Sequence, residues 1–549
     1  FMTYARAATG YKAGGVNARS INSGYEPEDL TSFELGAKSE LFDRRLRLNA
    51  AIFYVDHKDM QLQQFVAGSR GATSNTVNAG KAEYKGIEAE FEALLTDGLT
   101  LSGSLGYIDR EFKQFLIRDP ATNLLVDVAS TAHFTYSAKE TASAALQYDL
   151  PRFSIGQLSG RLEYNYRSKV YFQPTLIGTP LNESIPGAAR SLLDARLTFA
   201  SSSASDMAGK YQLLAGLCCA VIATGALAQS EAAGTAASDG LDEVEEVIVT
   251  AQRRAERLQD VPIAITVQSG EQLAKAGVTN LRDLTAVAPG VRIAGAGANT
   301  QPSIRGVQSQ QTDPGNDPNV AVYIDGVYQA NQISNSFDLP DVQQIEVLKG
   351  PQGTLFGRNA TGGAIRVFTL DPVFTPTGRV SLDYGRFSDV VAKGYLSGPL
   401  VDGKLAGSLS VFRQDSDGYH RDIVAGRDDV GGIESTVVRA KLLAKPTESM
   451  QLLLTLGYMD RWDGDTTPYA TIGGNTIARL FPGAVFAEKP YEFASSRDDF
   501  LDSTVHLASL KADFDFAAGT LSSVTAYNKT DAYYTQDGDA SNLDLLFYG

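Results

Sequence analysis

Apolar and polar residues alternate with a period of two over long stretches near both ends of the chain. In the stretch 45–56, RLRLNAAIFYVD, every second residue from Leu46 to Tyr54 is apolar, and Arg45, Arg47 and Asn49 stand between them. Successive side chains of a β-strand point to opposite faces, so this pattern predicts a strand with unlike faces. The pattern recurs at 86–93, 161–167, 438–444, 452–458 and 509–516.

The polar faces of these strands carry charges that a dry core would not accept. Glu88, Glu90 and Glu92 share one face, and each would need a partner if it were buried among apolar groups. A wet lumen would accept them. Runs of about ten alternating residues with aromatic ends are typical of outer-membrane barrels, although a soluble β-sandwich also alternates. Strand length, tyrosine-rich ends and the export signal described next favour a barrel, with roughly fifteen strands in this chain.

One charge-free run, Leu213 to Ala228, interrupts the alternation. It follows Met207 and Lys210 and ends in Ala226-Leu227-Ala228. A basic head, an apolar run and small residues at a cleavage site predict a secretory signal peptide over 207–228. A buried core helix is the alternative, and a membrane helix would need about 20 apolar residues. The only two cysteines lie inside this run, so the cleaved chain would hold no disulfide and no thiolate metal site.

The stretch 229–252 is small, acidic and polar, and it contains one short β-prone run, Val247 to Thr250. An isolated strand of this kind suits pairing with the sheet edge of another protein. An ordinary first strand of the next domain is the alternative.

Residues 253–372 have the pattern of a compact α/β domain. Ser269, with Gln272 three residues later, predicts a capped helix, and Pro289-Gly290 ends the apolar stripe that follows it. Strands and glycine turns come next. The segment 350–358, GPQGTLFGR, lacks the Lys and hydroxyl ending of a phosphate loop, so its glycines are interpreted as turns.

Composition narrows the function further. The net charge of −16 over 549 residues argues against nucleic acid as a partner. Four histidines make a multi-histidine metal site improbable, and no catalytic arrangement rises above chance. We therefore expect no enzyme activity, no metal site and no cofactor.

Several motifs resemble those of TonB-dependent outer-membrane receptors. EVIVTAQRR at 246–254 resembles a TonB box. PSIRGV, VAVYIDGVY and IEVLKGPQGTLFGRNATGGAI, which begin at Pro302, Val320 and Ile345, resemble the plug domain of the family. GYKAGGVNA, PEDLTSFELGAKSELFDRRLRLNAAIFY and YKGIEAEFEA, which begin at Gly10, Pro27 and Tyr84, resemble its later barrel strands.

The resemblance implies a fold and a mechanism. The fold class is a transmembrane antiparallel β-barrel of roughly 22 strands closed by an α/β plug, here incomplete. Such a receptor lies in the bacterial outer membrane, in contact with its lipid, and takes ligand from outside. TonB, driven by ExbB and ExbD, pairs with the box and pulls. The expected cargo is a ferric siderophore, with vitamin B12, haem or an oligosaccharide as alternatives within the family. A passive porin is the alternative of a different class, and it would need neither box nor plug.

Specific residues follow from the resemblance by motif. The implied TonB box consists of Glu246, Val247, Ile248, Val249 and Thr250. Arg305 and Arg358 match plug arginines that face barrel glutamates in the family, and Glu34 and Glu88 match those glutamates. We expect the arginines to pair with the glutamates and resist release of the plug, the alternative being that all four are generic lumen charges.

The order of the segments departs from the family. The expected domains are 1–200 late barrel strands, 201–206 junction, 207–228 signal peptide, 229–252 flexible segment with the box, 253–372 plug and 373–549 early barrel strands. Receptors of this family run from signal to box, plug, early strands and late strands. The sequence, which starts in mid-strand at Phe1, therefore suggests two receptor fragments joined at Met207, a fusion without function, with a working circular permutant as the rival interpretation.

Overall fold

The computed structural model describes most of the chain outside the predicted signal peptide. The described residues are 1–17, 24–68, 71–119, 122, 124–153, 156–171, 186–201, 243–252, 254–296, 299–309, 317–332, 338, 340–464, 478, 481–489, 491–537, 541–545 and 547–548. The predicted signal peptide, with Ala226 and Ala228, and most of the predicted junction lie outside the described residues.

The long strands within residues 1–201 form one antiparallel sheet. Its strands pair in the order β1 (Met2–Lys12), β4 (Glu28–Leu41), β5 (Leu46–Gly68), β6 (Gly71–Thr96), β7 (Leu99–Arg118), β9 (Glu140–Asp149), β10 (Gly156–Arg167) and β13 (Arg190–Ser201). Shorter strands at its loop end are β2 (Gly15–Val16), β3 (Gly24–Tyr25), β8 (Leu125–Asp127), β11 (Val170–Tyr171) and β12 (Pro186–Gly187).

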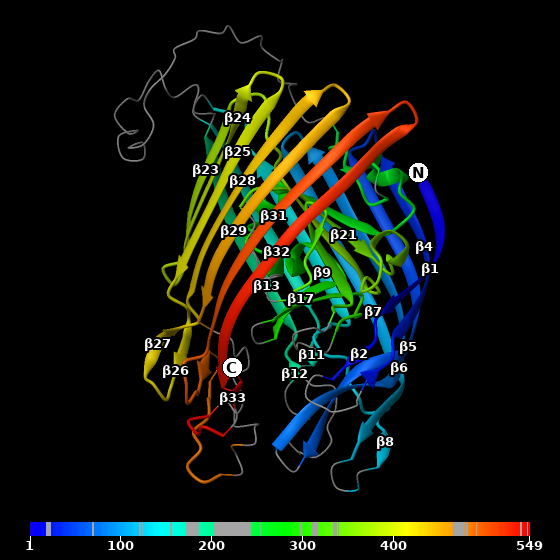
Figure 1. Ribbon diagram of the computed structural model, residues 1–549, viewed down its shortest axis with the longest axis vertical. Coiled ribbons are helices and arrows are strands. Elements are labelled where there is room, and N and C mark those ends of the chain that lie inside the picture. The colour runs from blue at the N-terminus through cyan, green and yellow to red at the C-terminus, as the bar shows by residue number, and fades with distance from the viewer. Residues whose placement is uncertain are drawn as a thin grey trace.

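A second antiparallel sheet is formed by the last part of the chain. Its order is β23 (Thr377–Tyr384), β24 (Val390–Val401), β25 (Leu405–Ser416), β28 (Ile433–Thr447), β29 (Met450–Asp463), β31 (Phe500–Phe516), β32 (Gly519–Asp537) and β33 (Phe547–Tyr548). Three short strands, β26 (His420–Asp422), β27 (Arg427–Val430) and β30 (Glu492–Phe493), form a sheet of their own. Figure 1 shows the two long sheets as curved walls, blue to teal and yellow to red, on either side of the green middle of the chain.

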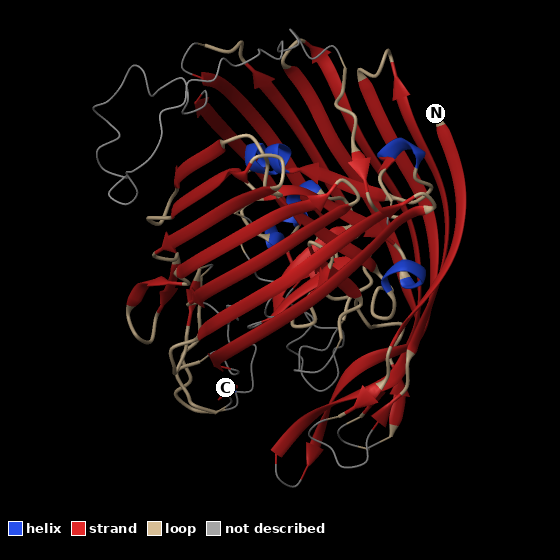
Figure 2. Cartoon of the chain, turned by 45° about the horizontal axis from the view of Figure 1, so that its top comes forward, coloured by secondary structure: helices blue, strands red, loops and turns tan. Residues whose placement is uncertain are grey.

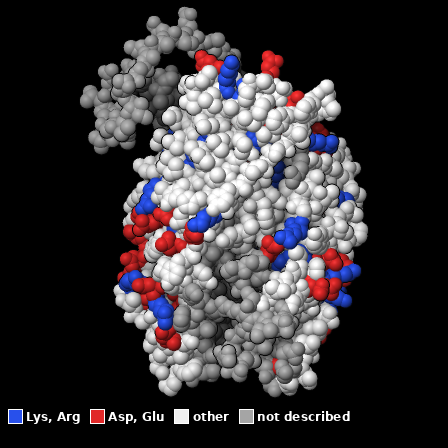
Figure 3. All heavy atoms as spheres, viewed as in Figure 1, with Lys and Arg blue, Asp and Glu red and all other residues white. Residues whose placement is uncertain are grey.

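The alternation in the sequence becomes an apolar outside and a polar inside. On β5, Leu48 and Ile52 are exposed, whereas Arg47 and His57 are buried toward the middle of the molecule. The outer face in Figure 3 shows a largely uncharged band, with charged side chains gathered above and below it. This is the distribution of a barrel wall in lipid. The predicted fold class is confirmed, with a transmembrane antiparallel barrel and a plug.

The barrel is not closed in the part of the chain that the structure describes, where the two walls belong to separate sheets. Most side chains of β13, β23 and β32 are exposed on both faces. β13 and β23 end their sheets, and the outer side of β32 is paired only with the short β33. An edge strand presents unpaired backbone N–H and C=O groups.

The plug lies between the walls. Its elements are β14 (Ile248–Val249), β15 (Glu256–Arg257), η3 (Leu258–Asp260), β16 (Ile265–Ser269), α2 (Gly270–Ala276), η4 (Leu281–Asp283), α3 (Leu284–Val287), β17 (Val291–Ala296), β18 (Asn299–Ile304), β19 (Val320–Ile324), β20 (Val327–Tyr328), β21 (Val342–Lys349), α4 (Gly353–Phe356) and β22 (Gly363–Thr369). The central sheet runs β16-β21-β22-β19-β20. Figure 2 shows the short helices among the strands, between the two walls.

Local sequence explains how α2 is placed. The Gln272 N–H donates to Ser269 Oγ at 3.2 Å, and Gln272 Oε1 accepts the Ser269 N–H at 2.9 Å, which is the predicted capping pair. Gly277 ends the helix in a left-handed conformation (φ 72°). One apolar core then joins the plug to the second wall, where Ile345 and Ile365 share a cluster with Phe412 and Met459. The plug is thereby packed on the second wall, and Val307 also joins an apolar cluster of the first wall.

In the described part of the chain, no helix combines the length and the apolar character that crossing a membrane requires.

Candidate functional site

Arg305 connects the plug to the first wall. It follows β18 in a left-handed backbone conformation (φ 55°), and its N–H donates to the Gly290 carbonyl at 2.8 Å. Its Nη1 donates to Glu34 Oε2 at 2.6 Å, and its Nε and Nη2 both donate to Glu88 Oε2, at 3.2 and 3.0 Å. The ring of Phe53 lies 4.0 Å from the guanidinium carbon. The structure therefore brings Arg305, Glu34 and Glu88 together in one buried cluster.

The electrostatics of Arg305 follow from this arrangement. Burial alone would lower the pKa of its guanidinium, but the charges of Glu88 and Glu34 and their hydrogen bonds outweigh burial. The net effect raises the pKa of Arg305 above its ordinary value. The cation is thus held firmly in its charged form by the two wall carboxylates.

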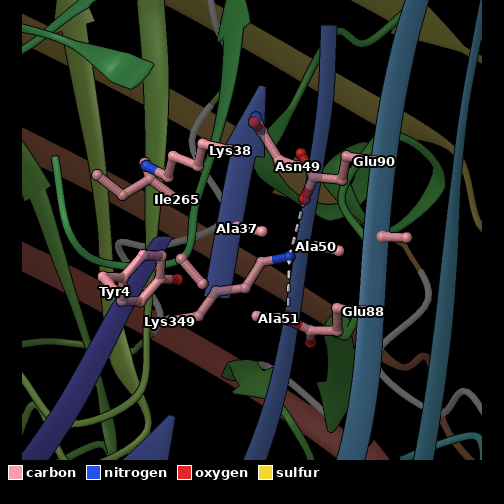
Figure 4. Close-up of a pocket in the computed structure, with 12 residues that line it drawn as sticks. Tyr4, Ala37, Lys38, Asn49, Ala50, Ala51, Glu88, Glu90, Ile265 and Lys349 are labelled. Atoms are coloured by element: carbon pink, nitrogen blue, oxygen red, sulfur yellow. Dashed lines mark hydrogen bonds and ion pairs between the residues drawn. The ribbon is translucent and has the colours of Figure 1, made fainter. Parts of the chain in front are cut away.

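Lys349, at the end of β21, extends the same cluster. Its Nζ lies 3.0 Å from Glu90 Oε1 and 3.5 Å from Glu88 Oε2, and Figure 4 shows it reaching from the plug toward the two glutamates. Glu34 also accepts from the Tyr4 hydroxyl at 2.7 Å and from the Ala264 N–H at 3.1 Å. The cavity beside these groups holds only about 20 Å³. We call the Arg305, Lys349, Glu34, Glu88 and Glu90 side chains the first-wall latch.

A second set of charges connects the plug to the other wall with the opposite polarity. Here the plug supplies carboxylates, and the wall supplies cations. Asp338 accepts from Arg461 Nη1 at 3.1 Å, and Asp341 pairs with Arg439. Lys441 Nζ lies 3.1 Å from Asp325. The four side chains Asp338, Asp341, Arg439 and Arg461 are almost fully buried; we call them the second-wall latch.

The second-wall latch was not predicted from the sequence. Arg439 and Lys441 stood on the polar face of the predicted strand 438–444, which was the available signal. No sequence pattern marked Asp338 and Asp341, because they lie in a loop and their partner strands come about 100 residues later in the chain.

Arg358 does not join the first-wall latch, and that expectation was wrong. It lies in the turn after α4, with an exposed side chain whose Nη2 is 3.8 Å from Asp317 Oδ2. The neighbouring Asn359 N–H donates to the Tyr11 carbonyl at the end of β1, whereas Glu34 and Glu88 lie inside β4 and β6. A motif match fixed the position of Arg358 in the plug, but not the direction of its side chain.

The predicted box segment is docked on the plug. Ile248 and Val249 form β14, which pairs antiparallel with Arg257 and Glu256 of β15. Val249 is buried, and Ile248 is 45% exposed. The Thr250 N–H donates to Glu346 Oε1 at 2.9 Å, and Gln344 Nε2 donates to the Ile248 carbonyl at 3.2 Å.

The flanks of the box carry ion pairs. Glu246 lies 2.7 Å from Arg257 Nε and 3.8 Å from Arg44 Nη2, while Val247 packs on the cluster around Val249. All five residues of the predicted box therefore contact the plug or the wall turn at 42–45. The contacts reach β21, the strand that carries Lys349.

These contacts position the plug mechanically between the two walls. Among the described residues, no group of three or more His, Cys, Asp or Glu side chains is arranged to hold a metal ion. Buried ion pairs on both walls connect the plug to the barrel strands, and separating them is costly unless water or another charge replaces each partner.

Comparison with known proteins identifies relatives of both parts of the chain. A family model described as TonB dependent receptor-like, beta-barrel, matches residues 1–213, and one described as TonB-dependent Receptor Plug Domain matches residues 257–364. The barrel match precedes the plug match, which is an unusual order.

The pesticin receptor of Yersinia pestis is 37% identical over 206 residues, which cover 37% of this chain and 30% of the relative. The iron-regulated outer membrane virulence protein of Vibrio cholerae serotype O1 is 28% identical over 243 residues, covering 41% and 35%. The crystal structure of the ferric yersiniabactin uptake receptor FyuA from Yersinia pestis is similar with 29% identity and a TM-score of 0.44, over 50% of this chain and 42% of that one. The chain spans about a third of the length of the curated relatives it matches.

Proposed function

Because this chain belongs to the TonB-dependent receptor family, we propose that it serves the active import of a scarce ligand, a ferric siderophore, driven by TonB with ExbB and ExbD. Receptors of this family are transporters of the bacterial outer membrane and not enzymes, and this chain is accordingly an outer-membrane protein.

The observation that carries the proposal is the burial of Arg305 between Glu34 and Glu88. A plug that served only as a stopper would be held well by apolar packing. Buried ion pairs are costly to form and costly to break one partner at a time, so they give a plug one defined resting position. A pull that separates both partners together releases it. A passive porin would gain nothing from this arrangement.

The proposed TonB box, Glu246 to Thr250, is suited to transmit such a pull. Ile248 is exposed, so a partner strand can reach this segment without entering the core. Thr250 and Ile248 are hydrogen-bonded to Glu346 and Gln344 of β21, respectively. The same strand ends at Lys349, in the first-wall latch. A force on the box is therefore delivered close to the charges that hold the plug.

The choice of cargo rests on the relatives. One of them is named for iron regulation and for an outer-membrane location, which favours an iron-bearing ligand. Vitamin B12, haem and an oligosaccharide are the alternatives, and uptake assays with each would separate them.

The order of the segments leaves a second candidate, a fusion of two receptor fragments without function. We propose the division into 1–200, 201–206, 207–228, 229–252, 253–372 and 373–549 given above. The open edges along β13, β23 and most of β32 favour this candidate, because an open edge in lipid is costly. Long-read sequencing of source DNA across the codons for Phe199 to Lys210 separates the two: molecules that span the junction support one real chain.

Uptake of a radiolabelled ferric siderophore into cells with and without TonB tests the proposed function. Replacing Ile248 by Pro removes the N–H of an exposed strand residue and should abolish TonB-dependent uptake. The matched control, Ile248→Val, keeps the strand and should transport normally. Uptake that persists without TonB, or in Ile248→Pro, would favour the passive pore.

A further inference from the structure

A cavity of about 250 Å³ lies between the plug and the first wall. Its plug side is formed by η4, α3 and the start of β17, and its wall side by β7, β9, β10 and β13. Gly290 belongs to its lining and also accepts the Arg305 N–H. The cavity therefore adjoins the first-wall latch.

Positive charge gathers in this cavity, in a chain that is acidic as a whole. Five cationic side chains but only two carboxylates line the cavity. The cations are Lys139, Arg167, Arg190, Arg282 and Arg292, and the carboxylates are Asp194 and Asp283. A charged cavity with low-dielectric walls concentrates ions of the opposite sign.

The carboxylates nearby do not neutralise the arginines. Asp283 accepts the backbone N–H groups of Thr279 and Asn280, at 2.9 and 3.2 Å, and so stabilises the turn before η4. Lys139 is paired with Asp109 at 2.9 Å. Within the described part of the chain, neither Arg167 nor Arg292 has a carboxylate within 4.0 Å.

Buried nitrogen atoms of two arginines are left without a hydrogen-bond acceptor. These are Nη1 of Arg167 and Nε of Arg292. Burial, together with the nearby charge of Arg167, lowers the pKa of Arg292 to about 10. An unsatisfied buried donor is costly, and an oxyanion between the two arginines would remove both the missing bonds and the repulsion.

We propose that this cavity binds an oxyanion group, a carboxylate or a phosphate, carried by the imported ligand. The planar fork of a guanidinium matches either group with two parallel hydrogen bonds. The volume is below that of ordinary drug-sized pockets, so the cavity takes a small anion or one anionic arm of a larger molecule. The identification of the cargo as the source of the anion rests on the proposed function.

Equilibrium binding to the full chain in detergent tests the proposal. Citrate and inorganic phosphate are titrated separately by calorimetry at low salt. We expect at least one to bind, with affinity that falls as salt rises. Arg167→Gln and Arg292→Gln should each weaken binding roughly tenfold. Binding of citrate alone assigns a carboxylate, binding of phosphate alone assigns a phosphate, and binding of both assigns the shared oxyanion chemistry.

Arg379→Gln, an exposed arginine on β23 of the other wall, is the matched control and should bind like the unchanged chain. If Arg292→Gln fails to fold, Arg190→Gln at the exposed edge strand replaces it. No binding of either anion, or equal binding by the cavity variants and the control, overturns the proposal. The titration needs no TonB, so import that fails while anion binding persists would count against the proposed function alone.

Discussion

Arg305 Nη1 and Glu34 Oε2 lie 2.6 Å apart, and their side chains are 1% and 3% exposed. One residue belongs to the plug and the other to the polar face of β4. Removing both charges from water costs several kcal/mol for each ion, so a buried pair contributes little net stability compared with an apolar contact. Its value is specificity, because one partner without the other is strongly unfavourable.

Replacing Arg305 by Leu should therefore loosen the plug. Glu34 and Glu88 would be left buried without their cation, and the expected loss is about 3–5 kcal/mol in the free energy of unfolding. Denaturant unfolding of the purified chain measures that loss, and entry of a large antibiotic into cells measures the leak. Adding Glu34→Gln and Glu88→Gln to Arg305→Leu should recover part of the stability.

Arg358→Leu is the control, because the Arg358 side chain is 62% exposed and its ion pair with Asp317 is long, at 3.8 Å. Its effect should stay within about 0.5 kcal/mol. Equal losses from the two variants would contradict the first-wall latch.

The sequence predicted which face of a strand each residue occupies, because the period of two depends only on local geometry. Glu88 was assigned to the polar face on that ground and Glu34 was identified by its motif, and the structure buries both. What lies opposite a lumen charge depends on contacts between distant segments. The pattern could therefore not reveal that Asp341 meets Arg439, nor that Arg358 turns toward Asp317.

The box segment marks another limit of local pattern. Val247 to Thr250 reads the same as a free tail or as a docked strand, because a two-residue strand carries almost no periodicity. Its docking on Glu256 and Arg257 depends on the buried site that the plug offers to Val249.

In the second-wall latch, we expect the two plug aspartates to differ in how much stability their removal costs. Asp341→Ala leaves Arg439 without its ion-pair partner and should cost about 3–5 kcal/mol. Asp338→Ala should cost less, because Arg461 keeps Asp463 at 3.3 Å. Denaturant unfolding of both variants gives the order. Combined with Arg305→Leu, each should add its loss almost independently, since the two latches share no partner. A reversed order would show that Asp463 does not compensate Arg461.

Gly290→Ala should disturb the first-wall latch without removing a charge. A Cβ at Gly290 would clash with Glu88 Oε1, on a backbone with φ 70°. Left-handed backbone costs a side chain about 1–2 kcal/mol, and displacement of Glu88 from Arg305 adds to it. Thermal unfolding measures the total.

Gly403→Ala separates the two contributions, because Gly403 has φ 66° and open space around its Cβ position. It should show the backbone cost alone. If Gly290→Ala is no worse than Gly403→Ala, Glu88 moves aside freely and the latch is less rigid than its contacts indicate.

Because of Glu346, we expect the folded plug to be more stable in mild acid than at neutral pH. Burial raises the pKa of its carboxyl above the ordinary 4.5, and the charge of Arg366 and the Thr250 N–H offset this only in part. A raised pKa means that the folded state holds this proton more readily than the unfolded state. The ionised form is therefore penalised at neutral pH, and the penalty disappears as pH falls through the raised value toward 4.5. Glu346→Gln, which resembles the protonated form, should be at least as stable as the unchanged chain at neutral pH.

Denaturant unfolding between neutral pH and about 4.5 checks the sign. The advantage of Glu346→Gln should shrink as pH falls. Glu271→Gln on α2 serves as the matched control, because it makes the same substitution at an exposed side chain of the plug. If the advantage of Glu346→Gln instead grows in acid, the Arg366 ion pair outweighs burial at this position. The hydrogen bond that docks Thr250 would then be strongest with Glu346 ionised, and acid would release the box segment rather than hold it.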